Sequence, residues 1–147
     1  MFPAYHSLLK LENIYQDDSI SVGIDEKLGL IYVKWQKHVN SKEFREYFLK
    51  FANIAIEKKM KYWLSDARAM HYLEFSDQNW LIQNMIPLLK LSSLEKFARV
   101  STKEGFAMMD ISRVYANIEQ LHDMNINTEF DFFFTIDAAI EWLFAKA

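Results

Sequence analysis

Polar side chains that could take part in chemistry follow the β-prone runs of this chain. Asp66 and Arg68 come directly after one apolar run, His38 follows an earlier run, and Ser101 and Lys103 follow a later one. Parallel strands bring their carboxyl ends to one edge of a sheet, and ligands bind at that edge. These residues therefore predict a polar rim with both signs of charge. The same residue types also form turns and helix caps, which is the structural interpretation of the rim.

Catalysis at this rim would need a nucleophile, a base and an orienting acid. Ser101, His38 and Asp66 have suitable types, but geometry defines a triad, and any α/β domain supplies such candidates. The chain has no Gly-rich phosphate loop and no nucleophile elbow, and its 4 His lack the i, i+4 spacing of a helical zinc site. We therefore assign no catalytic residue and predict no metal and no cofactor.

A predicted helix start adds two residues to the candidate binding rim, Ser76 and Trp80. Serine is a common helix cap, because its hydroxyl accepts a hydrogen bond from a free backbone N–H of the first turn. Phe75 precedes this position and Trp80 lies four residues beyond it, which is the spacing of a hydrophobic staple. We expect this strand-to-helix segment to contact a partner.

The elements that must position these residues alternate along the chain. We expect strands at 20–24, 30–35, 61–65, 96–102 and 130–134. We expect helices capped by Ser41, Ser76 and Thr135, and one from about Asp110 with an apolar stripe on one face. The first two strands form a hairpin and the others are joined by right-handed crossovers. The sequence thus predicts a single α/β domain over 1–147, with a mostly parallel five-stranded sheet, an N-terminal β-hairpin and four helices. Residues 1–17 are an N-terminal extension that forms an edge strand or a short helix.

The composition excludes several classes of function. A net charge of −3 argues against a general nucleic-acid binder, and the absence of Cys excludes disulfides, thiolate metal sites and a cysteine nucleophile. No run of about 18 apolar residues occurs, so we predict no membrane span. The N-terminus lacks the pattern of a signal peptide, and a cytoplasmic location is expected.

Aromatic residues are unusually frequent, with 12 Phe, 7 Tyr and 4 Trp. A sheet of five strands with four helices does not need so many in its core, so some are expected to form a surface patch or to line a cavity. Trp63, Trp80, Met108 and Met109 are the candidates for such a hydrophobic contact site.

Three short motifs resemble the STAS superfamily, whose founding members are anti-sigma-factor antagonists. They are W-L-S-D-A-R at 63–68, D-Q-N-W at 77–80 and A-I-E-W-L at 139–143. The closer resemblance is to an uncharacterised bacterial STAS/SEC14-like branch, and it covers roughly 18–146. It implies a STAS-like fold and a regulatory, non-catalytic activity.

The resemblance also implies a place for a regulatory phosphoserine, in the turn at 74–77. The usual acceptor position there holds Phe75, which leaves Ser76 as the one candidate phosphorylation site. A phosphate beside Glu74 and Asp77 would meet like-charge repulsion, so we do not expect this chain to be switched in that way.

Three hypotheses about function follow. The first is a non-catalytic regulatory or protein-interaction module that binds an unknown protein partner through the rim, with a homodimer as one form. The second is a binder of a lipid or another apolar small molecule, held by the excess aromatics. The third and least favoured is an enzyme of unknown reaction with Asp66 or His38 as a base.

Overall fold

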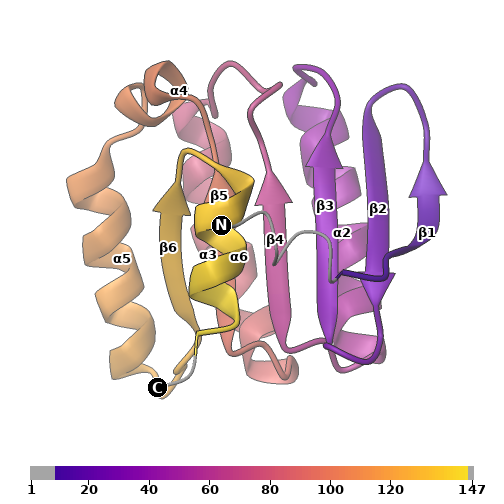
Figure 1. Ribbon diagram of the computed structural model, residues 1–147. Coiled ribbons are helices and arrows are strands. Elements are labelled where there is room, and N and C mark those ends of the chain that lie inside the picture. The colour runs from indigo at the N-terminus through magenta and orange to yellow at the C-terminus, as the bar shows by residue number, and fades with distance from the viewer. Residues whose placement is uncertain (1–8, 146–147) are drawn as a thin grey trace.

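The computed structural model describes residues 9–145, which fold around one six-stranded sheet (Figure 1). Its strands are β1 (Glu12–Gln16), β2 (Ile20–Asp25), β3 (Leu30–Trp35), β4 (Tyr62–Asp66), β5 (Lys96–Val100) and β6 (Glu129–Phe133), side by side in that order. β2 is antiparallel to both of its neighbours, β1 and β3, and β3 to β6 are parallel. The predicted α/β class, mostly parallel sheet and N-terminal hairpin are confirmed, whereas the predicted number of five strands is wrong.

The additional strand is β1, in the segment that the sequence left open between strand and helix. It pairs with β2, and its register shifts between Asn13 and Tyr15. A short edge strand with a local irregularity is one way in which proteins limit pairing with other chains. The part of the extension before residue 9 lies outside the described residues.

Within the described residues there are five helices: α2 (Ser41–Glu57), α3 (Phe75–Leu91), α4 (Lys103–Ala107), α5 (Ile111–Asp123) and α6 (Ile136–Leu143). The predicted number of four is therefore wrong, because α4 was missed. A helix of five residues is too short to show a helical period in sequence. It is capped by Thr102, whose Oγ1 accepts a hydrogen bond from the Gly105 N–H at 3.0 Å. None of the helices in residues 9–145 has the length and apolar character needed to cross a membrane.

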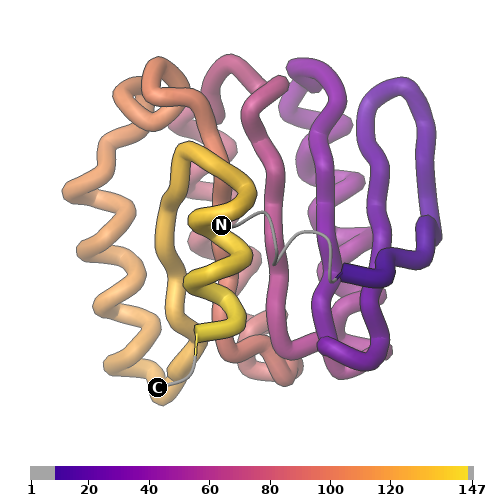
Figure 2. The backbone as a smooth tube through the Cα atoms, viewed as in Figure 1, coloured from indigo at the N-terminus to yellow at the C-terminus, as the bar shows by residue number. Residues whose placement is uncertain are grey.

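The helices form layers on both faces of the sheet. α2 and α3 lie behind it and α6 lies in front, while α5 runs beside β6 at the opposite end from β1 (Figures 1 and 2). Alternate residues of the central strands pack against the helices on opposite faces of the sheet. Ile31 and Trp63 join the core under α2 and α3, and Leu30 and Leu64 join the core under α6.

Two of the predicted helix caps are wrong. α2 begins at Ser41, but its cap is Asn40, whose Oδ1 accepts the Glu43 N–H at 2.8 Å. α3 begins at Phe75 with Glu74 as its N-cap and no side-chain cap bond, so Ser76 lies inside the first turn. The predicted hydrophobic staple is absent as well, since the Phe75 ring is 58% exposed. The helix starts predicted at Asp110 and Thr135 are confirmed, and both side chains accept cap hydrogen bonds.

Candidate functional site

Asp66 and Arg68, the centre of the predicted rim, form a local ion pair at the end of β4. Asp66 is buried, and its carboxylate accepts the Arg68 Nε–H at 2.9 Å and the Nη2–H at 2.8 Å. These hydrogen bonds raise the pKa of Arg68. Asp66 follows Leu64 on the α6 side of the sheet, and burial together with the nearby Asp66 raises the pKa of Tyr32 to about 12. Both oxygens of the Asp66 carboxylate are thus paired with an arginine two residues further along the chain.

The residues considered for a catalytic triad are not brought together. The His38 ring lies 5.5 Å from the His71 ring and 4.9 Å from the Tyr72 ring, and its Nδ1 accepts the His71 backbone N–H at 3.3 Å. Ser101 is buried at the end of β5, and its Oγ has no hydrogen-bond partner among the described residues. No hydrogen bond described in residues 9–145 joins Ser101, His38 and Asp66.

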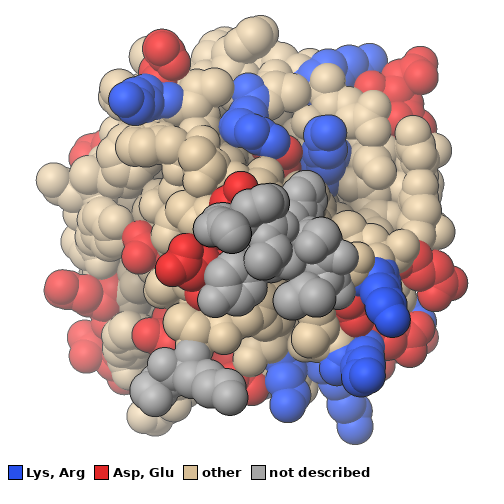
Figure 3. Space-filling model, in the orientation of Figure 1, with Lys and Arg blue, Asp and Glu red and all other residues tan. Residues whose placement is uncertain are grey.

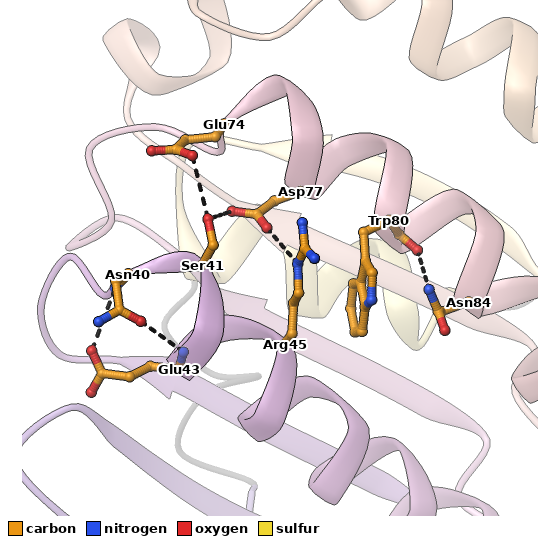
Figure 4. Close-up of polar contacts among 8 residues, drawn as sticks. All are labelled: Asn40, Ser41, Glu43, Arg45, Glu74, Asp77, Trp80 and Asn84. Carbon is orange, nitrogen blue, oxygen red and sulfur yellow. Dashed lines mark hydrogen bonds and ion pairs between the residues drawn. The ribbon is translucent and has the colours of Figure 1, made fainter.

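Trp80 belongs to the contact between α2 and α3. Asp77 accepts hydrogen bonds from the Ser41 hydroxyl at 2.7 Å and from the Arg45 Nε–H at 2.9 Å. The Arg45 guanidinium lies 5.4 Å from the centre of the Trp80 ring, between the carboxylate and the indole (Figure 4). These contacts fix the two helix starts against each other. The remaining rim residues, Ser76 and Lys103, are exposed.

The feature with the clearest potential to bind a ligand is a cavity of about 120 Å³ on the α3 side of the sheet. Its floor is formed mainly by side chains of β4, β5 and β6, and its roof mainly by side chains of α3 and α5; Trp35 of β3 and Phe44 and Phe48 of α2 also line it. The floor includes Trp63, Ser65, Phe97, Arg99, Phe130 and Phe132. The roof includes Leu81, Ile82, Met85, Val114, Asn117 and Ile118.

The floor is arranged in two rows that run across the sheet. In one row the Phe97 ring lies 5.4 Å from the Trp63 ring and 5.5 Å from the Phe130 ring. The strand register places Arg99 beside Ser65 on β4 and beside Phe132 on β6, which forms the second row. The cavity floor is therefore an aromatic surface with a cationic and a hydroxyl side chain along one side.

The roof differs from an ordinary helix–sheet interface. The apolar stripe of α5 predicted from the sequence is present, but Leu121 is the one buried residue of that helix. Val114 and Ile118 are partly accessible, because they border the cavity instead of closing onto the sheet. The same holds for Ile82 and Met85 of α3. Two helices thus present apolar side chains to a shared space.

Two buried donors at this cavity have no acceptor within the described part of the chain. They are the Arg99 Nε and the Trp63 Nε1. Burial lowers the pKa of Arg99 to about 10, so its guanidinium is charged at neutral pH. Asp131 also lines the cavity, but its Oδ1 accepts the Phe132 backbone N–H at 2.8 Å and it forms no ion pair with Arg99. The cavity lining therefore holds one arginine and one aspartate that form no ion pair with each other, and the Arg99 Nε remains without an acceptor.

A second arginine, Arg113, connects the two roof helices. It donates hydrogen bonds from α5 to Asn79 and, at 3.1 Å, to the Gln78 Oε1, both on α3. Its guanidinium also lies 4.0 Å from the centre of the Phe75 ring. Arg113 thus holds α5 against the start of α3, at the carboxyl end of the sheet.

Four residues were predicted to form a hydrophobic contact site. Trp63 and Met109 line the cavity, whereas Trp80 and Met108 do not. Arg99 was not predicted, because only residues that follow a strand were considered for the rim, and Arg99 is the fourth of the five residues of β5. One signal was present. Arg99 is two residues from Phe97 and therefore on the same face of a central strand, where a charged side chain is unusual.

Comparisons with known proteins identify no relative of this chain: no protein-family model, no curated protein and no solved structure matches it.

Proposed function

We propose that this protein is a non-catalytic module that binds a small, mainly apolar molecule between α3, α5 and the sheet. The observation that carries the proposal is the 120 Å³ cavity, toward which two amphipathic helices present apolar side chains. Ligand sites in proteins are mostly apolar concave spaces with a few polar groups. The STAS-like motifs support a regulatory use of such binding.

The size of the cavity limits the ligand. An apolar cavity of about 150 Å³ in another protein holds benzene. A space of about 120 Å³ with an opening fits one ring, or a branched chain of similar volume. A long lipid chain would need α5 to move away from α3.

Native mass spectrometry of the purified protein, before and after denaturation, is the first test, because it reports a retained small molecule and the subunit number together. Toluene then serves as a defined probe in NMR. We expect intermolecular NOEs from toluene to the methyl groups of Met85 and Ile118, which line the roof. Their absence at saturating toluene would overturn the proposal.

Two matched variants locate the binding. Ile118→Phe places a larger side chain into the cavity, and we expect it to abolish the NOEs to Met85. Ile54→Phe is the same substitution on α2, at a partly buried residue that does not line this cavity. It should leave the toluene contacts unchanged.

A second candidate is a protein-interaction module, and exposed apolar side chains at the carboxyl end of the sheet favour it. Phe75, Met108 and Phe134 are 58%, 64% and 46% exposed. They lie at the start of α3, after α4 and after β6. On the face seen in Figure 3, by contrast, acidic and basic side chains are intermixed among uncharged ones. Sedimentation of wild type and of Met108→Glu with Phe134→Glu tests self-association through these residues; identical concentration dependence would rule it out.

A further inference from the structure

We propose that the ligand of this cavity is a small monocarboxylate whose carboxylate binds Arg99 and whose apolar group lies on the Trp63, Phe97 and Phe130 rings. This inference rests on the proposed function and adds the chemical class of the ligand. It is independent of the rim residues predicted from sequence.

Arg99 carries a charge that has no partner in the fold. The residue as a whole is partly accessible, but its Nε is buried without an acceptor. A charged group that is removed from water without a partner is unfavourable, and such groups are normally paired with a carboxylate. Within residues 9–145 no carboxylate forms an ion pair with Arg99: Asp66 and Asp77 are paired with other arginines, and Asp131, which lines the same cavity, accepts the Phe132 backbone N–H. A carboxylate supplied by a ligand would complete the pairing.

The unpartnered polar groups at the cavity are hydrogen-bond donors. Arg99 Nε and Trp63 Nε1 are both donors, and both side chains belong to the same face of neighbouring strands. A carboxylate is an acceptor with two oxygens, and arginine binds it through parallel hydrogen bonds. A protonated amine has no acceptor, and an alcohol has an acceptor oxygen but no negative charge to pair with the guanidinium.

The number of cationic side chains in the cavity favours a monocarboxylate over a phosphate. Arg99 is the one lysine or arginine among the residues that line the cavity. A phosphate carries a larger charge and more acceptor oxygens, and its sites use several cations or a series of backbone N–H groups. One guanidinium with an indole N–H and a hydroxyl from Ser65 suits a single negative charge.

The charge of Arg99 lies at one side of the aromatic surface of the cavity floor. The Ser65–Arg99–Phe132 row lies directly beside the aromatic row in the strand register. A ligand with its carboxylate on Arg99 therefore has its apolar group over Phe97 and its neighbours. This matches an arylcarboxylate, or a branched-chain carboxylate of the same size.

The test compares three probes of nearly equal size, which are benzoate, benzamide and toluene. Dissociation constants come from NMR titrations of the Met85 and Ile118 methyl signals at pH 7. We expect wild type to bind benzoate at least 10-fold more tightly than benzamide. In Arg99→Met this preference should fall to less than threefold, while toluene binding stays within twofold of wild type.

The matched control is Lys34→Met, which removes one positive charge from an exposed residue of β3 outside the cavity lining. It should retain the preference for benzoate, which excludes an effect of net charge. Circular dichroism of each variant checks that the fold is kept, and toluene binding reports that the cavity itself is intact.

The outcomes distinguish the two proposals. Equal binding of benzoate and benzamide in wild type, with toluene bound, would overturn the carboxylate inference and leave the proposed function standing. A preference for benzoate that survives Arg99→Met would also overturn it. If none of the three probes contacts Met85 or Ile118, the proposed function fails as well.

Discussion

Replacing Arg99 by Met should make the protein without ligand more stable. Methionine is close in length to the aliphatic part of arginine, so it keeps the packing on the cavity floor while removing the charge. A residue that serves the fold would show the opposite effect, because its loss would remove a hydrogen bond or an ion pair. The sign of the change in unfolding free energy is therefore informative by itself.

The magnitude follows from the electrostatics of Arg99. Burial lowers its pKa from 12.5 to about 10, which corresponds to about 3 kcal/mol of destabilisation of the charged form, at about 1.4 kcal/mol per pKa unit. The folded pKa lies below the unfolded value, so the unfolded chain binds the proton more tightly between about pH 10 and 12.5. Stability rises with pH through that window, and the full penalty applies below it. Methionine fills much of the same space as arginine, so little new cavity is created. We therefore expect the unfolding free energy to rise by about 1–3 kcal/mol at pH 7.

Urea unfolding monitored by circular dichroism at 25 °C measures this change. The midpoint should rise with an unchanged slope, which indicates a change in stability and not in the surface exposed on unfolding. In thermal unfolding, a chain of this size should gain about 2–4 °C per kcal/mol. At equal concentration, benzoate should raise the midpoint of wild type by more than that of Arg99→Met, whereas toluene should raise both midpoints equally. A loss of stability of about 1 kcal/mol or more in Arg99→Met would refute the reasoning, since it would mean that the fold already provides a partner for the charge.

Three further predictions concern the rest of the fold. Hydrogen bonds, above all from Tyr47, lower the pKa of Asp17 to about 2, so Tyr47→Phe should raise that pKa toward 3.8 in carboxyl NMR titrations. The stability that Asp17 contributes above about pH 4 is lost as the pH falls toward 2, and Tyr47→Phe should lose less stability over that range. An unchanged Asp17 pKa in Tyr47→Phe would contradict the assignment. Gly29 has a φ of 73°, so Gly29→Ala should lower the unfolding free energy by about 1–2 kcal/mol in urea titrations, and a neutral result would show that the turn relaxes. Arg113→Met should speed amide hydrogen exchange in α5 while exchange in α2 stays the same, because Arg113 joins α5 to α3; equal rates in α5 would exclude a role in holding that helix.

The parallel sheet and its helices were predictable because their signals are local and repeated. The residues Leu30 to Trp35 form an apolar run typical of a central strand, and they do form β3. Asp110 and Thr135 were identified as helix starts from residue type and position, and both act as caps. β1 was ambiguous, because an edge strand needs no strong pattern of its own when the free edge of β2 provides its hydrogen bonds.

The candidate site was less predictable, because it depends on distances between elements. The sequence identifies Asp66 as a polar residue at a strand end, but it does not show that Arg68 occupies both carboxylate oxygens. It shows an apolar stripe on α5, but not that the stripe stands away from the sheet. A serine near a predicted helix start was also not enough to identify the N-cap. Asn40 rather than Ser41 caps α2, and Ser76 lies inside α3, because the choice depends on where the chain leaves the extended conformation.

The location of Arg99 explains why stability and binding oppose each other in this protein. A charged residue on the same side of β5 as Phe97 contradicts the apolar pattern of that side of the strand. Apolar helix faces that do not close onto the sheet also lose packing contacts. Both features reduce the stability of the protein without ligand, and both are relieved by one bound carboxylate. Conflicts between local rules and the fold are expected where a protein binds something. Here the two conflicts occur in the same cavity, and two variants separate their effects on binding. Arg99→Met should stabilise the fold and reduce the affinity for benzoate to within threefold of that for benzamide. Ile118→Phe should stabilise the fold or leave it unchanged, and it should abolish the binding of benzoate, benzamide and toluene alike.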